Sequence, residues 1–249
     1  MDLFGLIGYP LTHSFSKSYF SEKFEALGLT KSHKYELFEL ESATEFPRLF
    51  KKYPNLKGIN ITIPYKQSVF DYLDELDISV VKVGAVNVVK KTHDNKLIGY
   101  NSDYYGFKKS LLEVLGEGFV LKNLKALILG YGGAARAVVA ALEDLGVSVQ
   151  LVGRKSSDIA VNYSESDSFI ETHKLIVNCS PLGTYPNSET FPNIDYQQLG
   201  KDHFLFDLVY NPAETVFLRK GREHGSSVKN GYDMLVYQAE KSWEIWQKS

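Results

Sequence analysis

A glycine-rich turn near the middle of the chain has the residue types and spacing of a phosphate-binding site. Residues 130–135 read Gly-Tyr-Gly-Gly-Ala-Ala and follow the apolar run 124–129, which is typical of a buried strand. Apolar residues then recur at helical spacing, so the N–H groups of a helix N-terminus would point at the phosphates. The pattern predicts a dinucleotide site, although an ordinary strand–helix connection is the alternative. The residues expected to line the pyrophosphate are Gly130, Gly132, Gly133 and Ala134.

Two cations follow the next expected strand, at residues 147–152. An acidic residue at this point usually holds the ribose hydroxyls of NAD, but this chain has Gly153, Arg154 and Lys155. Arg154 and Lys155 would suit the 2′-phosphate of NADP, whereas the plain alternative is a solvated turn. We therefore predict NADP as the cofactor.

Polar candidates for catalysis lie around a strand expected at residues 58–64. Asn60 and Thr62 alternate with isoleucines, so their side chains share one face. A proline ends this strand, and Lys66 is expected to open a helix. Asp103 stands near the start of a long helix, where it could be the N-cap. Taken singly, these residues could also be solvent-facing strand positions, a surface lysine and a helix cap.

Six short motifs, in register over nearly the whole chain, resemble the signature sequences of the shikimate dehydrogenase family. They are Ser-Phe-Ser at 14–16, Asn-Ile-Thr-Ile-Pro-Tyr-Lys at 60–66, Gly-Ala-Val-Asn at 84–87, Gly-Tyr-Asn-Ser-Asp-Tyr-Tyr-Gly at 99–106, the glycine turn, and Met-Leu-Val-Tyr-Gln-Ala at 234–239. The resemblance implies a two-domain α/β fold. An N-terminal α/β substrate domain, residues 1–102, would be completed by a returning C-terminal helix at 232–249. Residues 103–231 would form a Rossmann-like NADP-binding domain.

The resemblance also implies roles for individual residues. Lys66 and Asp103 would be the catalytic pair in the reversible reduction of 3-dehydroshikimate to shikimate, a step of aromatic amino-acid biosynthesis. Leu208 and Gly231 match positions near the nicotinamide. The residues implied to bind the substrate are Ser14, Ser16, Asn60, Thr62, Asn87, Tyr210 and Gln238.

The chemistry of these side chains suits such a substrate. Shikimate carries one carboxylate and three hydroxyls, which serine, amide and threonine groups can bind as donors and acceptors. A lysine ammonium can stabilise the negative charge that develops on a carbonyl oxygen and can donate the proton. Some positions depart from the family pattern: Gly153 replaces a frequent Asn, and Lys155 a frequent Thr, so a contact to the adenosine ribose is lost. Val88 and Thr184 replace a usual Thr and Met.

The elements that must position these residues alternate between strand and helix, which predicts mainly parallel sheets with helices on both faces. The net charge of −2 gives no reason to expect a nucleic acid or an anionic membrane as partner. The single cysteine, Cys179, and the lack of a recognisable signal segment favour a cytoplasmic location. We expect a small-molecule substrate, no metal, and a monomer or homodimer. Two alternatives stay open: a dual-specificity quinate/shikimate dehydrogenase and a non-catalytic regulatory relative.

Overall fold

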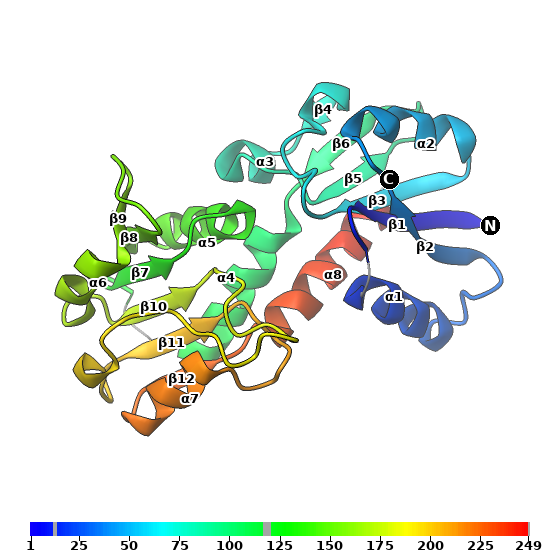
Figure 1. Cartoon of the computed structure of the whole chain (residues 1–249). Helices are drawn as coiled ribbons and strands as arrows, with labels where there is room; N and C mark the ends of the chain where they lie inside the picture. Colours follow the sequence, from blue (N-terminus) through cyan, green and yellow to red (C-terminus); the bar gives the residue numbers. More distant parts are fainter. Residues whose placement is uncertain (12–13, 117–120, 249) are drawn as a thin grey trace. The chain divides into compact units, whose positions relative to one another are not determined.

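The computed structural model describes residues 1–11, 14–116 and 121–248. The chain divides into two compact units, which we call unit 1 (Met1–Ser102 with Gln238–Ser249) and unit 2 (Asp103–Tyr237). Each unit has its own six-stranded sheet with helices packed against it (Figure 1). The expected α/β fold with two sheets and a C-terminal helix that returns to the first unit is confirmed.

Unit 1 is built on a mixed sheet in the strand order β2-β1-β3-β5-β6-β4. β1 pairs in parallel with β2 and β3, and the hairpin of β5 and β6 adds two antiparallel pairings. The elements are β1 (Asp2–Gly8), α1 (Phe15–Ala26), β2 (His33–Glu39), a 3₁₀ turn (Ala43–Glu45), α2 (Phe46–Lys52), β3 (Leu56–Ile61), a 3₁₀ turn (Phe70–Tyr72), β4 (Glu75–Leu76), α3 (Ile78–Val83), β5 (Val88–Lys91) and β6 (Leu97–Tyr100). The C-terminal part of α8 (Tyr232–Gln247) completes the unit.

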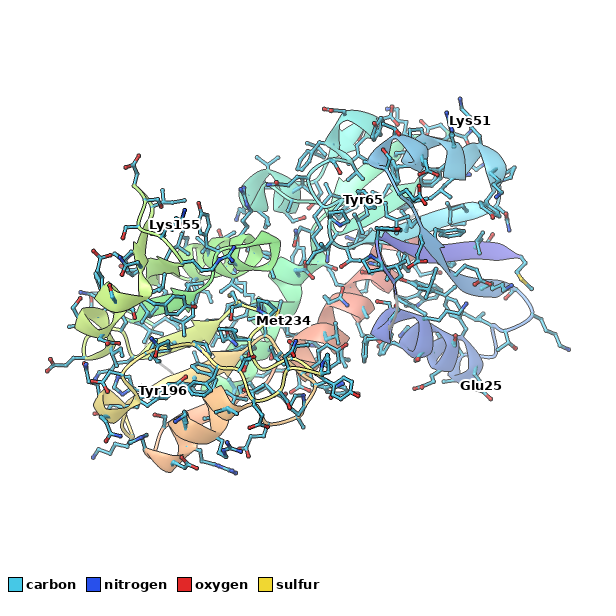
Figure 2. The ribbon with its side chains drawn as sticks, in the orientation of Figure 1. Glu25, Lys51, Tyr65, Lys155, Tyr196 and Met234 are labelled. Atoms are coloured by element: carbon cyan, nitrogen blue, oxygen red, sulfur yellow. The ribbon has the colours of Figure 1, made fainter. Side chains whose placement is uncertain are left out.

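Both faces of this sheet are covered because apolar residues occupy both sides of its central strands. Leu3 and Ile7 of β1 belong to one buried cluster, which also contains Tyr65, labelled in Figure 2. Phe4 of β1 belongs to another cluster, which includes Trp246 of α8. The C-terminal helix is therefore part of the core of unit 1.

Unit 2 contains an all-parallel sheet in the order β12-β11-β10-β7-β8-β9. Successive strands run outward from β7 to β9, and the chain then returns to place β10 on the other side of β7. The strand order thus reverses between β7 and β10. The elements are α4 (Ser102–Leu115), β7 (Lys125–Leu129), α5 (Gly133–Asp144), β8 (Ser148–Gly153), β9 (Ala160–Asn162), α6 (Tyr163–Ile170), β10 (Leu175–Asn178), a 3₁₀ turn (Tyr196–Gln198), β11 (Phe204–Asp207), α7 (Val216–Glu223), β12 (Ser227–Lys229) and the first residues of α8.

Two local expectations were wrong. Lys66 lies in a series of turns rather than at a helix start, because bonds such as Tyr65 N to Thr62 O close tight turns and no helix propagates. Asp103 is the second residue of α4 rather than its N-cap. The helix begins at Ser102, whose N–H donates to Asn87 Oδ1. Among the described residues, no helix has the length and apolarity needed to cross a membrane.

Candidate functional site

The glycine turn lies at the point where the strand order of unit 2 reverses. Gly130 follows β7 with a φ of 93°, and a Cβ on it would lie 3.2 Å from Ser180, which follows β10. Both the backbone conformation and the close approach therefore require glycine. In parallel α/β sheets, ligands bind outside the carboxyl ends of the strands at such a reversal.

The N-terminus of α5 is suited to an anion. Its N-cap is Gly132, so no side chain caps the first amides of the helix, and a Cβ on Gly132 would meet no atom within 4 Å. These amides and the positive end of the helix dipole can thus bind the pyrophosphate of a dinucleotide. The residues present fit this part of NADP.

The two cations expected at a 2′-phosphate follow β8. Arg154 and Lys155 are exposed, and Figure 2 shows Lys155 in the segment between β8 and β9. Gly130 N donates to Val152 O at 2.8 Å, so the glycine turn is held to the carboxyl end of β8. The groups expected to bind phosphates follow two adjacent strands and are thereby brought to the same end of the sheet.

Leu208 and Gly231 lie against each other. A Cβ on Gly231 would be 2.2 Å from Leu208 O, and Gly231 N donates to Val209 O at 3.1 Å. Only glycine allows this approach between the segment after β11 and the start of α8. Tyr210, in the same segment, keeps 38% of its surface exposed, and burial raises the pKa of its hydroxyl.

A buried carboxylate that the sequence analysis did not select fixes this segment. Asp207 accepts hydrogen bonds from Asn178 Nδ2 (2.9 Å), Val209 N (3.0 Å) and Thr215 Oγ1 (2.6 Å). Its side chain has no exposed surface, and burial raises its pKa to about 6, with the three donors acting in the opposite direction. Asp207 thus joins the carboxyl ends of β10 and β11 to the start of α7. The signal for it was an aspartate at the end of an apolar strand.

In unit 1, four of the expected substrate residues are joined by one network of buried polar groups. Tyr35 is hydrogen-bonded to the Ser16 side chain and donates to Asn60 Oδ1 at 2.9 Å. Asn60 Nδ2 in turn donates to Asn87 O (3.3 Å) and Ser242 Oγ (2.9 Å). Both N–H groups of Asn60 are therefore used within the protein.

The network continues to the last helix. Asn87 Nδ2 donates to Ser102 Oγ at 3.0 Å, and Ser102 Oγ lies 3.2 Å from Ser242 Oγ. Ser102 Oγ also donates to Gln238 Oε1 at 3.4 Å, and Ser242 Oγ donates to Gln238 O at 2.9 Å. The sequence analysis missed Tyr35, Ser102 and Ser242. Ser242 could have been found from its i, i+4 spacing to Gln238 on one helix face.

Val86 and Asn87 form hydrogen bonds with the backbone at Lys66 and next to Asp103, the two catalytic candidates. Val86 N donates to Lys66 O at 2.8 Å, and Asn87 Oδ1 accepts from Ser102 N at 2.6 Å. The consecutive residues Val86 and Asn87 therefore fix the backbone of Lys66 and of Ser102, the residue before Asp103. The side chains of Lys66 and Asp103 are both half-buried.

The remaining substrate candidates are placed individually. Ser14 is the N-cap of α1, and its Oγ accepts from Lys17 N at 3.3 Å. Thr62 follows β3, and its N–H donates to Ile7 O at 2.9 Å. Of the substrate and catalytic candidates, Tyr210 and Asp103 belong to unit 2 and the others belong to unit 1.

The parallel sheet with a glycine turn at its strand reversal places unit 2 in the Rossmann class of dinucleotide-binding folds. Residues 6–89, in unit 1, match the family model for the shikimate dehydrogenase substrate binding domain. The chain is 39% identical over 264 residues to the shikimate dehydrogenase (NADP(+)) of Clostridium beijerinckii, covering 100% of this chain and 93% of the relative. The chain belongs to the shikimate dehydrogenase family.

Solved structures give the same relationship. A shikimate 5-dehydrogenase from Thermus thermophilus, in complex with NADP(H) and shikimate, has a TM-score of 0.83 and 28% identity, covering 99% of this chain and 94% of its own. A quinate dehydrogenase from Corynebacterium glutamicum, in complex with NAD, has a TM-score of 0.88 and 27% identity, with coverage of 99% and 93%. The fold is thus shared by relatives that differ in substrate and cofactor.

Proposed function

We propose that this protein catalyses the reversible, NADP-dependent reduction of 3-dehydroshikimate to shikimate in aromatic amino-acid biosynthesis. The observation that carries the proposal is an open helix N-terminus at the strand reversal of unit 2, in a chain similar over its whole length to NADP-dependent shikimate dehydrogenases. Unit 1, together with its part of α8, would bind the substrate. Unit 2 would bind NADP.

The substrate would be bound mainly by the polar groups of unit 1. Ser14 accepts a backbone N–H and retains its own proton, which it can donate to the substrate carboxylate. Ser16 lies at one end of the buried network and Gln238 at the other, so the network holds both in fixed positions. Both side-chain N–H groups of Asn60 donate to Asn87 O and Ser242 Oγ, so Asn60 would position its neighbours in the network. The full proposed set is Ser14, Ser16, Asn60, Thr62, Asn87, Tyr210 and Gln238.

Lys66 and Asp103 would manage the proton. The nicotinamide supplies the hydride when NADP is bound. The Lys66 ammonium stabilises negative charge on the substrate carbonyl oxygen and gives that oxygen its proton. The Asp103 carboxylate orients Lys66 Nζ and accepts a hydrogen bond from the reacting hydroxyl. In the oxidation of shikimate, neutral Lys66 accepts the proton.

The cofactor would be held by backbone groups at one end and by cations at the other. Gly130, Gly132, Gly133 and Ala134 would line the pyrophosphate. Arg154 and Lys155 would bind the 2′-phosphate, Arg154 with two parallel N–H groups. Leu208 and Gly231 would lie beside the nicotinamide. We further propose a cytoplasmic location, for which the single cysteine is the supporting observation, and a monomer or homodimer.

The proposal is tested by following absorbance at the nicotinamide band with shikimate or quinate, each combined with NADP or NAD. We expect turnover with shikimate and NADP, and a kcat/KM at least ~10-fold lower for quinate. The added hydroxyl of quinate must fit beside Ser14 and Ser16, whose hydroxyls already bond to Lys17 N and Tyr35. An unpaired buried hydroxyl costs about 1–3 kcal/mol.

Other results would change the assignment. Equal kcat/KM values for shikimate and quinate would identify a dual-specificity enzyme, which the similarity to a quinate dehydrogenase makes the second candidate. Binding of shikimate and NADP without turnover would identify a non-catalytic relative.

A further inference from the structure

An aromatic ring lies close to Gly153, the last residue of β8. Tyr131 is the second residue of the glycine turn, and 47% of its surface is exposed. A Cβ built on Gly153 would be 3.7 Å from Cδ1 of Tyr131. Gly130, the residue before Tyr131, donates a hydrogen bond from its N–H to the carbonyl oxygen of Val152, the residue before Gly153. This hydrogen bond therefore holds together the two backbone segments that carry Tyr131 and Gly153.

The position of this ring has a chemical consequence. In Rossmann folds the residue at the end of the second strand contacts the adenosine ribose, but Gly153 has no side chain to do so. The ring beside it can offer a purine an apolar face, and base–aromatic contacts are favourable. The next two residues, Arg154 and Lys155, supply the charge for a phosphate.

We propose that Tyr131, whose ring lies beside Gly153, forms one wall of the adenosine site of the cofactor. This inference rests on the proposed NADP-dependent function and identifies a further cofactor-binding residue in it. Tyr131 would recognise the adenosine common to NADP and NAD. Arg154 and Lys155 would then carry the discrimination between the two cofactors.

The inference predicts non-additive effects of substitutions at the two positions. A Cβ at position 153 would be in ordinary van der Waals contact with the Tyr131 ring, so we expect the longer side chain of Gly153→Asn to displace the ring. In a protein that already carries Tyr131→Ala, the same change has no ring to displace. Residues in contact show such coupling, whereas independent sites give additive effects.

The experiment is calorimetric titration of the full-length protein with adenosine 2′,5′-bisphosphate, which lacks the nicotinamide. We expect Tyr131→Ala to raise Kd about 10-fold and Tyr131→Phe to leave it within about 2-fold, because the ring is retained. Gly153→Asn should change Kd by one factor in the wild type and by a different factor in combination with Tyr131→Ala, because the ring is present only in the first case. Tyr185→Ala, at another exposed tyrosine of unit 2, should leave Kd unchanged.

Steady-state kinetics provide a second readout. Tyr131→Ala should raise KM for NADPH and NADH by the same factor, with kcat unchanged. Unchanged affinity of Tyr131→Ala for the bisphosphate, or an equal loss in Tyr185→Ala, overturns the inference even when the wild type oxidises shikimate. Tyr131-dependent binding by a wild type that has no shikimate activity refutes the proposed function and supports the adenosine site.

Discussion

The buried carboxylate of Asp207 predicts a specific dependence of stability on pH. Burial raises its pKa from 3.8 to about 6 in the folded protein. A group whose pKa is raised on folding stabilises the fold fully below its unfolded pKa, and this contribution is lost as pH rises through the folded pKa. A difference of about 2 units corresponds to about 3 kcal/mol, lost between about pH 4 and pH 7.

The test compares the wild type with Asp207→Asn, which retains an acceptor for Val209 N and Asn178 Nδ2 but does not titrate. Unfolding free energies from urea titration at several pH values are subtracted, so that groups common to both proteins cancel. Between pH 5 and pH 8 we expect the wild type to lose about 1.4 kcal/mol relative to the variant. Asp202→Asn, at an exposed aspartate of the same unit, is the matched control for the substitution itself.

If the difference in unfolding free energy between the wild type and Asp207→Asn did not change with pH, burial would not raise the pKa of Asp207. A wild type that gains stability relative to the variant as pH rises would show that the three hydrogen-bond donors outweigh desolvation. Either result would refute the reasoning.

The remaining predictions concern the cofactor. Gly231→Ala places a methyl group 2.2 Å from Leu208 O, so the segment after β11 must move by about 1 Å. We therefore expect kcat/KM to fall by roughly 10²-fold and the unfolding free energy to fall by about 1–3 kcal/mol. Gly200→Ala, where the new methyl meets no atom within 4 Å, is the matched control, and equal losses in both variants would contradict the argument. Replacing Arg154 and Lys155 with alanine should raise KM for NADPH at least ~10-fold more than KM for NADH, since only NADPH has the 2′-phosphate; parallel increases would show that these cations do not recognise it.

The sequence predicted the parts of the fold that depend on local patterns. The glycine turn and the apolar strand before it were recognised because both the backbone requirement and the burial appear in consecutive residues. The stretch 156–172 is polar and shows no apolar period in the sequence, yet it contains β9 and α6. These are short elements, stabilised by packing against β8 and by the Asn162–Glu165 capping box, and their apolar faces are too short to show a period.

The site was predicted only in part because its connections are distant in sequence. Asn60, Asn87 and Gln238 could be selected as polar residues in motifs, but nothing local showed that Tyr35 and Ser242 join them through hydrogen bonds. The same holds for Asp207, whose side-chain partners Asn178 and Thr215 lie 29 residues before it and 8 residues after it. Tertiary pairing decides such networks, and one sequence does not contain that information.

The proposed catalytic role of Lys66 is tested most directly by shikimate-dependent reduction of NADP in Lys66→Met. A thioether cannot donate or accept the proton, so turnover should fall by roughly 10²–10⁴-fold while shikimate and NADP still bind. Lys57→Met, which replaces an exposed lysine of β3 in the same unit, should keep the wild-type turnover. Near-native turnover in Lys66→Met would contradict the account, because Lys66 would then have no part in the chemistry.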